Sequence, residues 1–279
     1  MYLCTYFDSN YLDKGKVCYH TIRKTSPDAK IFILCLDNNV YEIVSKFQNV
    51  IPVLPGEIEI SYPELLKVKS HRLNKEYYAT MTAFFPLHIF NRHSEVDVLF
   101  YTDADIAFWS DPSEMLDVFG NKSLMVVDHG FEPPRSGVRF NVGILGYRND
   151  GYCKEFLNWW KDRCIEWCKW ETRSDGMCAD QGYLNIVHDE PQKFKNTMSC
   201  PHPGINIGPW NIAKHQITES DGRLLVDGSY NLICYHYHEF KMLGLDSYHS
   251  TGWKHTASDR ELIYEPYFEL MQQSISNVL

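Results

Sequence analysis

The first half of the chain alternates short apolar runs with amphipathic stretches. Runs rich in β-branched and aromatic residues predict strands over 2–6, 31–36 and 50–54, and the stretches between them predict helices over 15–24 and 40–47. Strands that alternate with helices form a parallel sheet through right-handed crossovers. The pattern therefore predicts an α/β fold with a mostly parallel central sheet, flanked by helices, and a crevice beyond the carboxyl ends of the strands.

The second half continues this pattern without an internal repeat, a low-complexity tract or a linker, so we expect a single domain over 1–279. The remaining predicted elements are a long helical stretch over 63–91, strands over 123–127, 140–147 and 232–235, helices over 156–170 and 260–274, and a loop over 130–137.

The apolar run from Val96 to Tyr101 ends in two carboxylates, Asp103 and Asp105. The run predicts a buried strand in a sheet that is covered on both faces. Because side chains alternate along an extended chain, the two carboxylates point the same way. Together they offer hard oxygen ligands to a divalent cation and leave positions open for phosphate oxygens. Ser110-Asp111-Pro112 then predicts the start of a helix.

Composition narrows the class of partner. The chain has 36 acidic and 27 basic residues and a net charge of −9, which argues against nucleic acid. An acidic protein that binds phosphates needs a metal or local cations, in agreement with the metal site. No window approaches the roughly 18 apolar residues of a membrane span. The nine scattered cysteines favour reduced thiols in a cytoplasmic protein, in solution or peripheral at the inner face of a membrane.

No glycine-rich phosphate loop follows the first predicted strand, so a bound base must be held by side chains. Tyr11 could stack on the base, while Asp8 or Asn10 bonds its edge; a partly buried aromatic at a helix start explains Tyr11 equally well. Arg72 or Lys75 is a candidate for the phosphates, although such charge runs usually form a solvated helix face.

Five short motifs occur in a characteristic order: T-Y-F-D-S-N-Y, Y-T-D-A-D, F-N-V-G, A-D-Q-G-Y-L-N and Y-H-Y-H-E-F-K. From Thr5 to Lys241 the chain resembles GT-A-type glycosyltransferases of the nucleotide-diphospho-sugar transferase superfamily, and is similar to family 8 and bacterial polysaccharide enzymes. The resemblance implies a GT-A (Rossmann-like) fold. It also implies transfer of a hexose-type sugar from a UDP-sugar to a hydroxyl of a glycan or glycolipid, with retention.

The resemblance divides the chain into a nucleotide-binding half (1–106), a sugar and acceptor half (107–241) and a C-terminal loop and helix (242–279). It also implies individual roles. The nucleotide would contact Asp8, Asn10, Tyr11, Asp103 and Lys241, and we add Thr5 and Arg72 to the expected nucleotide contacts. The cofactor would be Mn²⁺ or Mg²⁺ on Asp103, Asp105 and a late histidine. The donor sugar would contact Asn141 and Asp180, with Gln181 beside the anomeric carbon and Asp180 as the carboxylate that would act if the reaction inverted.

The late motif departs from the family's usual H-x-x-G-x-x-K, because Glu239 stands near the glycine position. The metal ligand is therefore either His236 or His238. Period-two alternation places both on one side of a strand. We favour His238, because it directly precedes Phe240-Lys241 as in shorter variants of the motif.

Two other functions compete with this interpretation. A sugar nucleotidylyltransferase usually carries a glycine-rich basic loop after its first strand, and residues 5–14 contain none. A non-catalytic carbohydrate-binding protein has no need of the two carboxylates and the late histidine. The sequence predicts neither the sugar, the acceptor and the linkage nor the oligomeric state.

Overall fold

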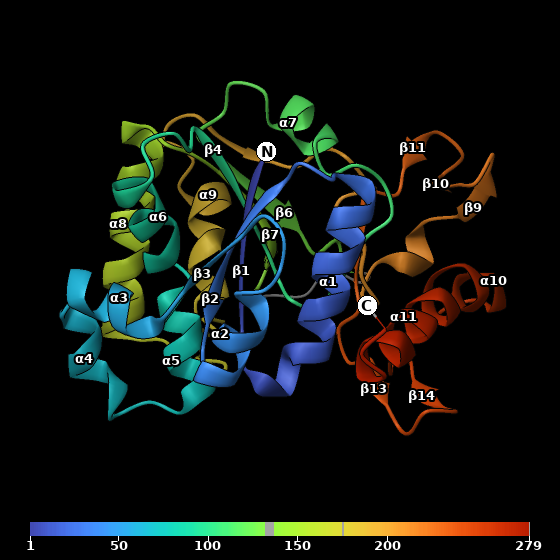
Figure 1. The fold of residues 1–279 in the computed structure, drawn as a ribbon. Coiled ribbons are helices and arrows are strands. Elements are labelled where there is room, and N and C mark those ends of the chain that lie inside the picture. Colours follow the sequence, from blue (N-terminus) through green and yellow to red (C-terminus); the bar gives the residue numbers. More distant parts are fainter. Residues whose placement is uncertain (132–136, 175, 279) are drawn as a thin grey trace.

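A seven-stranded sheet with the order β3-β2-β1-β4-β7-β6-β8 lies at the centre of the molecule in the computed structural model, which describes residues 1–131, 137–174 and 176–278 (Figure 1). Its strands are β1 (Tyr2–Phe7), β2 (Lys30–Cys35), β3 (Val50–Val53), β4 (Val98–Thr102), β6 (Leu124–Asp128), β7 (Phe140–Arg148) and β8 (Thr197–Ser199). All neighbouring pairs are parallel except those that β7 makes with β4 and β6. The mostly parallel sheet predicted from the sequence is thus confirmed.

The two faces of the sheet bury alternate side chains. Leu3 and Phe100 pack with α1, α2 and α7 on one face, whereas their neighbours Cys4 and Tyr101 pack with α3 to α6 and α8 on the other. Figure 1 shows α6 and α8 on one side of the sheet and α1 on the opposite side. These helices are α1 (Leu12–Thr25), α2 (Asn38–Val44), α3 (Pro55–Ser61), α4 (Glu64–Lys69), α5 (Asn74–Met81), α6 (Phe84–Arg92), α7 (Glu114–Phe119) and α8 (Gly151–Glu166).

Two predicted helices have different limits in the structure. The stretch over 63–91 is divided into α4, α5 and α6. The break before α5 arises because Leu73 is extended and Glu76 accepts its backbone N–H at 3.0 Å, which starts a new helix. The helix predicted over 156–170 begins earlier, where Asp150 caps α8 by accepting from Cys153, and it ends at Glu166, since Trp167 is extended. Most of the loop predicted over 130–137 lies outside the described residues.

The smaller strands, most of which follow β8 in the chain, lie around a third apolar cluster. They are β9 (Ile217–Ser220), β10 (Arg223–Val226) and β11 (Tyr230–Asn231) in one sheet, β12 (Cys234–His236) paired with β5 (Ile106–Phe108), and the hairpin of β13 (Lys241–Met242) and β14 (Tyr248–His249). Helices complete the chain: η1 (Ser9–Tyr11), η2 (Gln181–Asn185), α9 (Ile186–Asp189), η3 (Ile212–Lys214), α10 (Ala257–Asp259), the π-helical turn η4 (Arg260–Tyr264) and α11 (Glu265–Ile275). The predicted C-terminal helix is therefore present, and it packs against α1.

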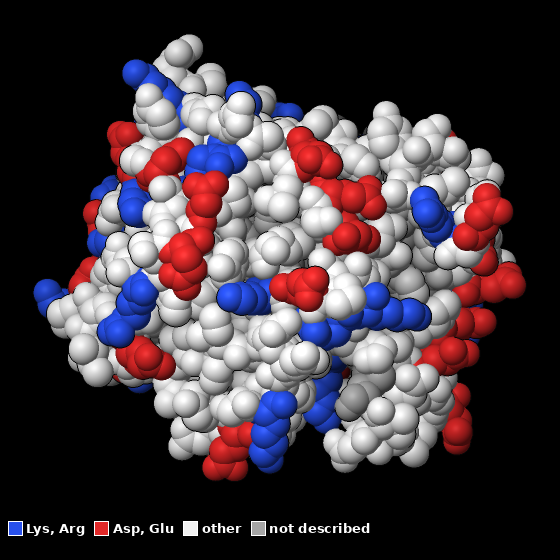
Figure 2. All heavy atoms as spheres, turned by 45° about the horizontal axis from the view of Figure 1, so that its top comes forward, with Lys and Arg blue, Asp and Glu red and all other residues white. Residues whose placement is uncertain are grey.

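The cysteines lie mostly in the interior, whereas charged side chains lie on the surface. All nine cysteines are free, and seven of them are buried. On the face shown in Figure 2, acidic and basic side chains are interspersed over the described residues. Within the described ranges, no helix combines the length and the hydropathy that a membrane span requires.

Candidate active site

A cavity of about 650 Å³ lies where β1 and β4 end. The two strands are parallel neighbours, with Cys4 opposite Tyr101, so the residues that follow them meet at one edge of the sheet. Asp8, Asn10 and Tyr11 after β1 and Asp103 and Asp105 after β4 all line this cavity. The crevice expected beyond the strand ends is therefore present.

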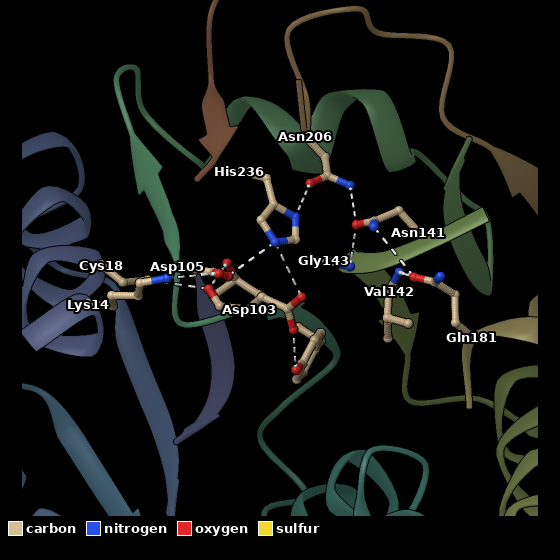
Figure 3. A network of polar contacts seen from close by, with 12 residues as sticks. Lys14, Cys18, Asp103, Asp105, Asn141, Val142, Gly143, Gln181, Asn206 and His236 are labelled. Atoms are coloured by element: carbon tan, nitrogen blue, oxygen red, sulfur yellow. Dashed lines mark hydrogen bonds and ion pairs between the residues drawn. The ribbon is translucent and has the colours of Figure 1, made fainter. Parts of the chain in front are cut away.

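Three side chains on the cavity wall form a group of potential metal ligands: Asp103, Asp105 and His236 (Figure 3). The Nε2 atom of His236 lies 3.1 Å from Asp105 Oδ1 and 3.7 Å from Asp103 Oδ2. Pairing of β12 with β5 produces this arrangement, because it sets His236 opposite Ile106, the residue after Asp105. Tyr101 donates to Asp103 Oδ1 at 2.6 Å and so helps to orient that carboxylate.

The charges of this group are strongly coupled. Burial disfavours ionisation of Asp105, but His236 and Lys14 hold the pKa of its carboxyl well below the usual range. Burial and the charge of Asp105 together raise the pKa of Asp103 despite the opposing effect of His236. Burial also disfavours the imidazolium form of His236, yet the two carboxylates raise its pKa.

The donor set fits a divalent cation. Two carboxylates and an imidazole suit Mn²⁺ or Mg²⁺ and leave further positions open. Adjacent ligands of an octahedral ion with bonds of about 2.1 Å lie roughly 3 Å apart. The separation of 3.1 Å between His236 Nε2 and Asp105 Oδ1 matches that value.

The preference for His238 as the ligand does not agree with this geometry. β12 ends at His236, and the following residues turn, with Glu239 in the left-handed region at φ +66°. Strand alternation therefore does not extend to His238, whose ring packs against Trp210 at 5.8 Å between centroids. His238 lines the cavity, but within the described residues the ligand group contains His236 in its place.

Asn141 and Gln181 meet on another wall of the cavity. Gln181 Oε1 accepts from the backbone N–H of Val142 at 3.1 Å and from Asn141 Nδ2 at 3.4 Å. Gly143 stands beside them, and a Cβ there would lie 2.5 Å from both Asn141 Oδ1 and His236 Nδ1. The glycine of F-N-V-G thus lets the imidazole approach β7.

Asp180 is a buried carboxylate on the cavity wall beside Gln181. It directly precedes the 3₁₀ helix η2. Burial, reinforced by the charge of Asp103, raises the pKa of Asp180 to about 7. Asp180 is therefore a carboxyl group that changes its protonation near neutral pH.

Three predicted site residues are not among those that line the cavity. Thr5 is buried within the sheet. The guanidinium of Arg72 bonds Thr80 and the carbonyl of Ile165, which ties the turn between α4 and α5 to the end of α8, whereas Lys75 does reach the cavity. Lys241 is exposed on the β13–β14 hairpin. The nucleotide contacts predicted for these three side chains are therefore not part of the cavity lining.

The sequence analysis missed Lys14, which lies beside Asp105, and two residues that line the cavity. Lys14 on α1 extends its ammonium to 3.4 Å from Asp105 Oδ2 and to 4.9 Å from the Tyr11 ring centre. His129 and Trp210 form an aromatic wall with ring centroids 5.2 Å apart. The i, i+3 spacing of Tyr11 and Lys14 could have indicated that Lys14 lies near Tyr11. No local sequence pattern indicates His129 or Trp210.

No family model matches the chain. Two proteins of Bacillus subtilis (strain 168) are similar over most of their length, and both are described as uncharacterised. YfnF is 28% identical over 99% of this chain and 93% of its own, and YfnD is 29% identical over 93% and 85%. Neither description names an activity, so these relatives assign no function to this chain.

Solved structures identify the fold. The galactosyltransferase LgtC, in complex with donor and acceptor sugar analogues, superposes with a TM-score of 0.58 at 15% identity, over 97% of this chain and 95% of LgtC. The chain has a GT-A glycosyltransferase fold. Apo GlyE of Streptococcus pneumoniae TIGR4 gives 0.59 at 13% identity over 97% of this chain and 59% of GlyE. Mouse xyloside xylosyltransferase 1 gives 0.54 at 11% identity over 85% and 97%.

Proposed function

We propose that the protein is a metal-dependent glycosyltransferase of the family 8 type. It moves a hexose-type sugar from a UDP-sugar to a hydroxyl of a glycan or glycolipid, with retention, and acts in the cytoplasm, in solution or peripheral at the inner face of a membrane. The observation that carries the proposal is the ligand group Asp103, Asp105 and His236 on the wall of a cavity that also contains Tyr11 and Gln181. The GT-A fold supports it.

The nucleotide end of the cavity has side chains of suitable chemistry. Tyr11 provides an aromatic face for uracil, and Asp8 and Asn10 provide hydrogen-bonding groups for its edge. Asp103, Asp105 and His236 would hold Mn²⁺ or Mg²⁺. A bound ion acts as a Lewis acid that offsets charge on the departing diphosphate. Lys14 adds a positive charge beside Asp105.

The sugar end of the cavity is formed by Asn141, Asp180 and Gln181. Two hydrogen bonds to Oε1 fix the amide of Gln181, so it can lie against the anomeric carbon without swinging away. Glycosyl transfer proceeds through an oxocarbenium-like transition state, for which a fixed polar environment is favourable. Asp180 is the carboxylate that would act as base if the reaction inverted.

A donor screen tests the proposal. The purified protein is incubated with a panel of UDP-sugars and Mn²⁺ or chelator, and release of UDP is measured with and without simple glycoside acceptors. We expect release from at least one UDP-sugar that requires Mn²⁺, and a product anomer that matches the donor. Asp105→Asn should reduce turnover at least about 100-fold, whereas Asp117→Asn on the exposed side of α7 should not. Absence of turnover and of Mn²⁺-dependent UDP binding would refute the proposal.

A further inference from the structure

A chain of hydrogen bonds joins the metal-ligand group to the sugar end of the cavity (Figure 3). His236 Nδ1 lies 3.2 Å from Asn206 Oδ1, and Asn206 Nδ2 donates to Asn141 Oδ1 at 2.8 Å. Asn141 Nδ2 lies 3.0 Å from His129 Nε2 and 3.4 Å from Gln181 Oε1. Asn206 is 1% exposed, so water has little access to these contacts. An amide that was absent from every sequence motif therefore lies at the centre of the network.

His129, at one end of this hydrogen-bond network, fixes which groups donate and which accept. His129 Nδ1 lies 3.2 Å from the carbonyl oxygen of Arg139, which can only accept, so Nδ1 carries the hydrogen. Burial lowers the pKa of His129 to about 4, which leaves the ring neutral and Nε2 as an acceptor for Asn141 Nδ2. Independently, the backbone N–H of Gly143 donates to Asn141 Oδ1 at 2.7 Å. Both constraints orient the Asn141 amide in the same way.

This orientation determines which nitrogen of His236 is available. Asn141 presents an oxygen to Asn206, so Asn206 must donate to it and present its own Oδ1 to His236. That oxygen accepts a hydrogen from Nδ1, which leaves the lone pair of neutral His236 on Nε2. Nε2 is the atom that faces Asp105 and Asp103. A second hydrogen bond of this kind fixes the tautomer and ring orientation of metal-binding histidines.

The backbone at Asn206 restricts which residues can serve there. Its φ is +62°, in the left-handed region that asparagine and glycine tolerate better than most residues. We propose that Asn206 is a positioning residue that fixes His236 for metal binding and, through Asn141, fixes Gln181 for the sugar. This inference rests on the proposed function only in taking Asp103, Asp105 and His236 as the metal ligands.

Two substitutions separate the two contacts of Asn206. Asn206→Gly keeps the left-handed backbone and removes both contacts. Asn206→Asp keeps an acceptor for His236 but sets an oxygen against Asn141 Oδ1. A matched control is Asn196→Gly, since Asn196 also has a left-handed φ of +60° and donates to Asn121 and Ser123, away from the cavity. Circular dichroism verifies that each variant is folded.

Mn²⁺ affinity is measured by calorimetry, and the hydrogen on His236 Nδ1 is observed by ¹H–¹⁵N NMR of the protein loaded with diamagnetic Mg²⁺. We expect Asn206→Gly to bind Mn²⁺ about 10–100-fold more weakly and to lose the slowly exchanging Nδ1–H signal. Asn206→Asp should retain both properties and bind a UDP-sugar about tenfold more weakly, because the contact with Asn141 is lost. Asn196→Gly should match the wild type.

The outcomes distinguish this inference from the proposed activity. A folded Asn206→Gly variant with wild-type Mn²⁺ affinity would overturn the positioning role, even if the wild type transfers sugar. If the variants change Mn²⁺ affinity as expected but the wild type transfers no sugar, the positioning role stands and the proposed activity is refuted. A wild type that binds no Mn²⁺ would overturn the positioning role as well.

Discussion

At the scale of single residues, Tyr11 is the side chain most directly suited to a base. It is 46% exposed, lines the cavity, and has the Lys14 ammonium 4.9 Å from its ring centre. Tyr11→Ala should weaken UDP binding in the presence of Mn²⁺ by about 1–3 kcal/mol, the range for loss of a base stack. Isothermal titration of UDP measures this. Tyr11→Phe keeps the ring and should bind within about threefold of the wild type; equal affinity of the alanine variant would place the base elsewhere.

Asp180 makes a prediction about pH. Its pKa is raised to about 7 in the folded protein, compared with about 3.9 for an unperturbed aspartate. The folded state therefore holds this proton more tightly than the unfolded state, so the contribution of Asp180 to the free energy of unfolding falls as pH rises from about 4 to about 7. Asp180→Asn should raise the free energy of unfolding at pH 8 by on the order of 2–4 kcal/mol, with little change at pH 4.5.

Urea denaturation in a chelating buffer at the two pH values measures this effect. Asp246→Asn, at an exposed position between β13 and β14, is the control and should show no such pH dependence. An Asp180→Asn variant whose stability differs from that of the wild type by the same amount at both pH values would contradict the assigned burial effect.

At the scale of elements, Gly15 sets how closely α1 packs on the end of β1. A Cβ at Gly15 would lie 2.5 Å from the Phe7 ring, whereas a Cβ at Gly56 on α3 would meet no atom within 4 Å. Gly15→Ala should therefore destabilise the protein by about 1–3 kcal/mol through overpacking, although alanine favours helix. Gly56→Ala should be neutral or stabilising by up to about 1 kcal/mol. Thermal unfolding of both variants tests this contrast. If both substitutions changed the melting temperature by the same amount, the overpacking at Gly15 would be refuted.

Element pairings also explain which site residues could be foreseen. Asp8, Asn10, Tyr11, Asp103 and Asp105 follow strands whose periodicity is visible in the sequence, and parallel neighbours end at the same edge. The limits of α4, α5 and α8 were harder to predict, because extended residues such as Leu73 and Trp167 interrupt patterns that otherwise remain compatible with a helix.

At the scale of the whole molecule, the cavity combines residues from both ends of the chain. Tyr11 and Trp253 line the same space. Glu239 accepts from Gly252 at 3.0 Å and from Thr251 at 3.3 Å, which holds the segment before Trp253 beside the end of β12. A ligand that fills the cavity should therefore restrain this segment.

Limited trypsin digestion tests that expectation. Cutting after Lys254 should slow when UDP and Mn²⁺ are both present and should not slow with either alone, because each needs the other to occupy the site firmly. Arg223, exposed on the β9–β10 hairpin, provides an internal control whose cleavage should not change. Equal rates after Lys254 with and without both ligands would show that the segment is a structural cap.

The sequence by itself determined the α/β architecture, the buried strand before Asp103 and the cluster of polar residues at the strand ends, because these depend on local periodicity and on strand alternation. Through the motifs that carry the family resemblance it also pointed to Asn141, Asp180 and Gln181, which line the cavity. Each of these features is contained in a few neighbouring residues.

Only the tertiary structure decided the remaining features of the site. Antiparallel pairing of β12 with β5 brought His236, and not His238, beside Asp103 and Asp105, and burial in one network joined Asn206 to residues 65 positions before it and 30 after it. The same long-range packing tied Arg72 to the end of α8 instead of the cavity. The physical reason is that a contact between distant segments depends on how whole elements pair and pack, which no local pattern of polar and apolar residues specifies.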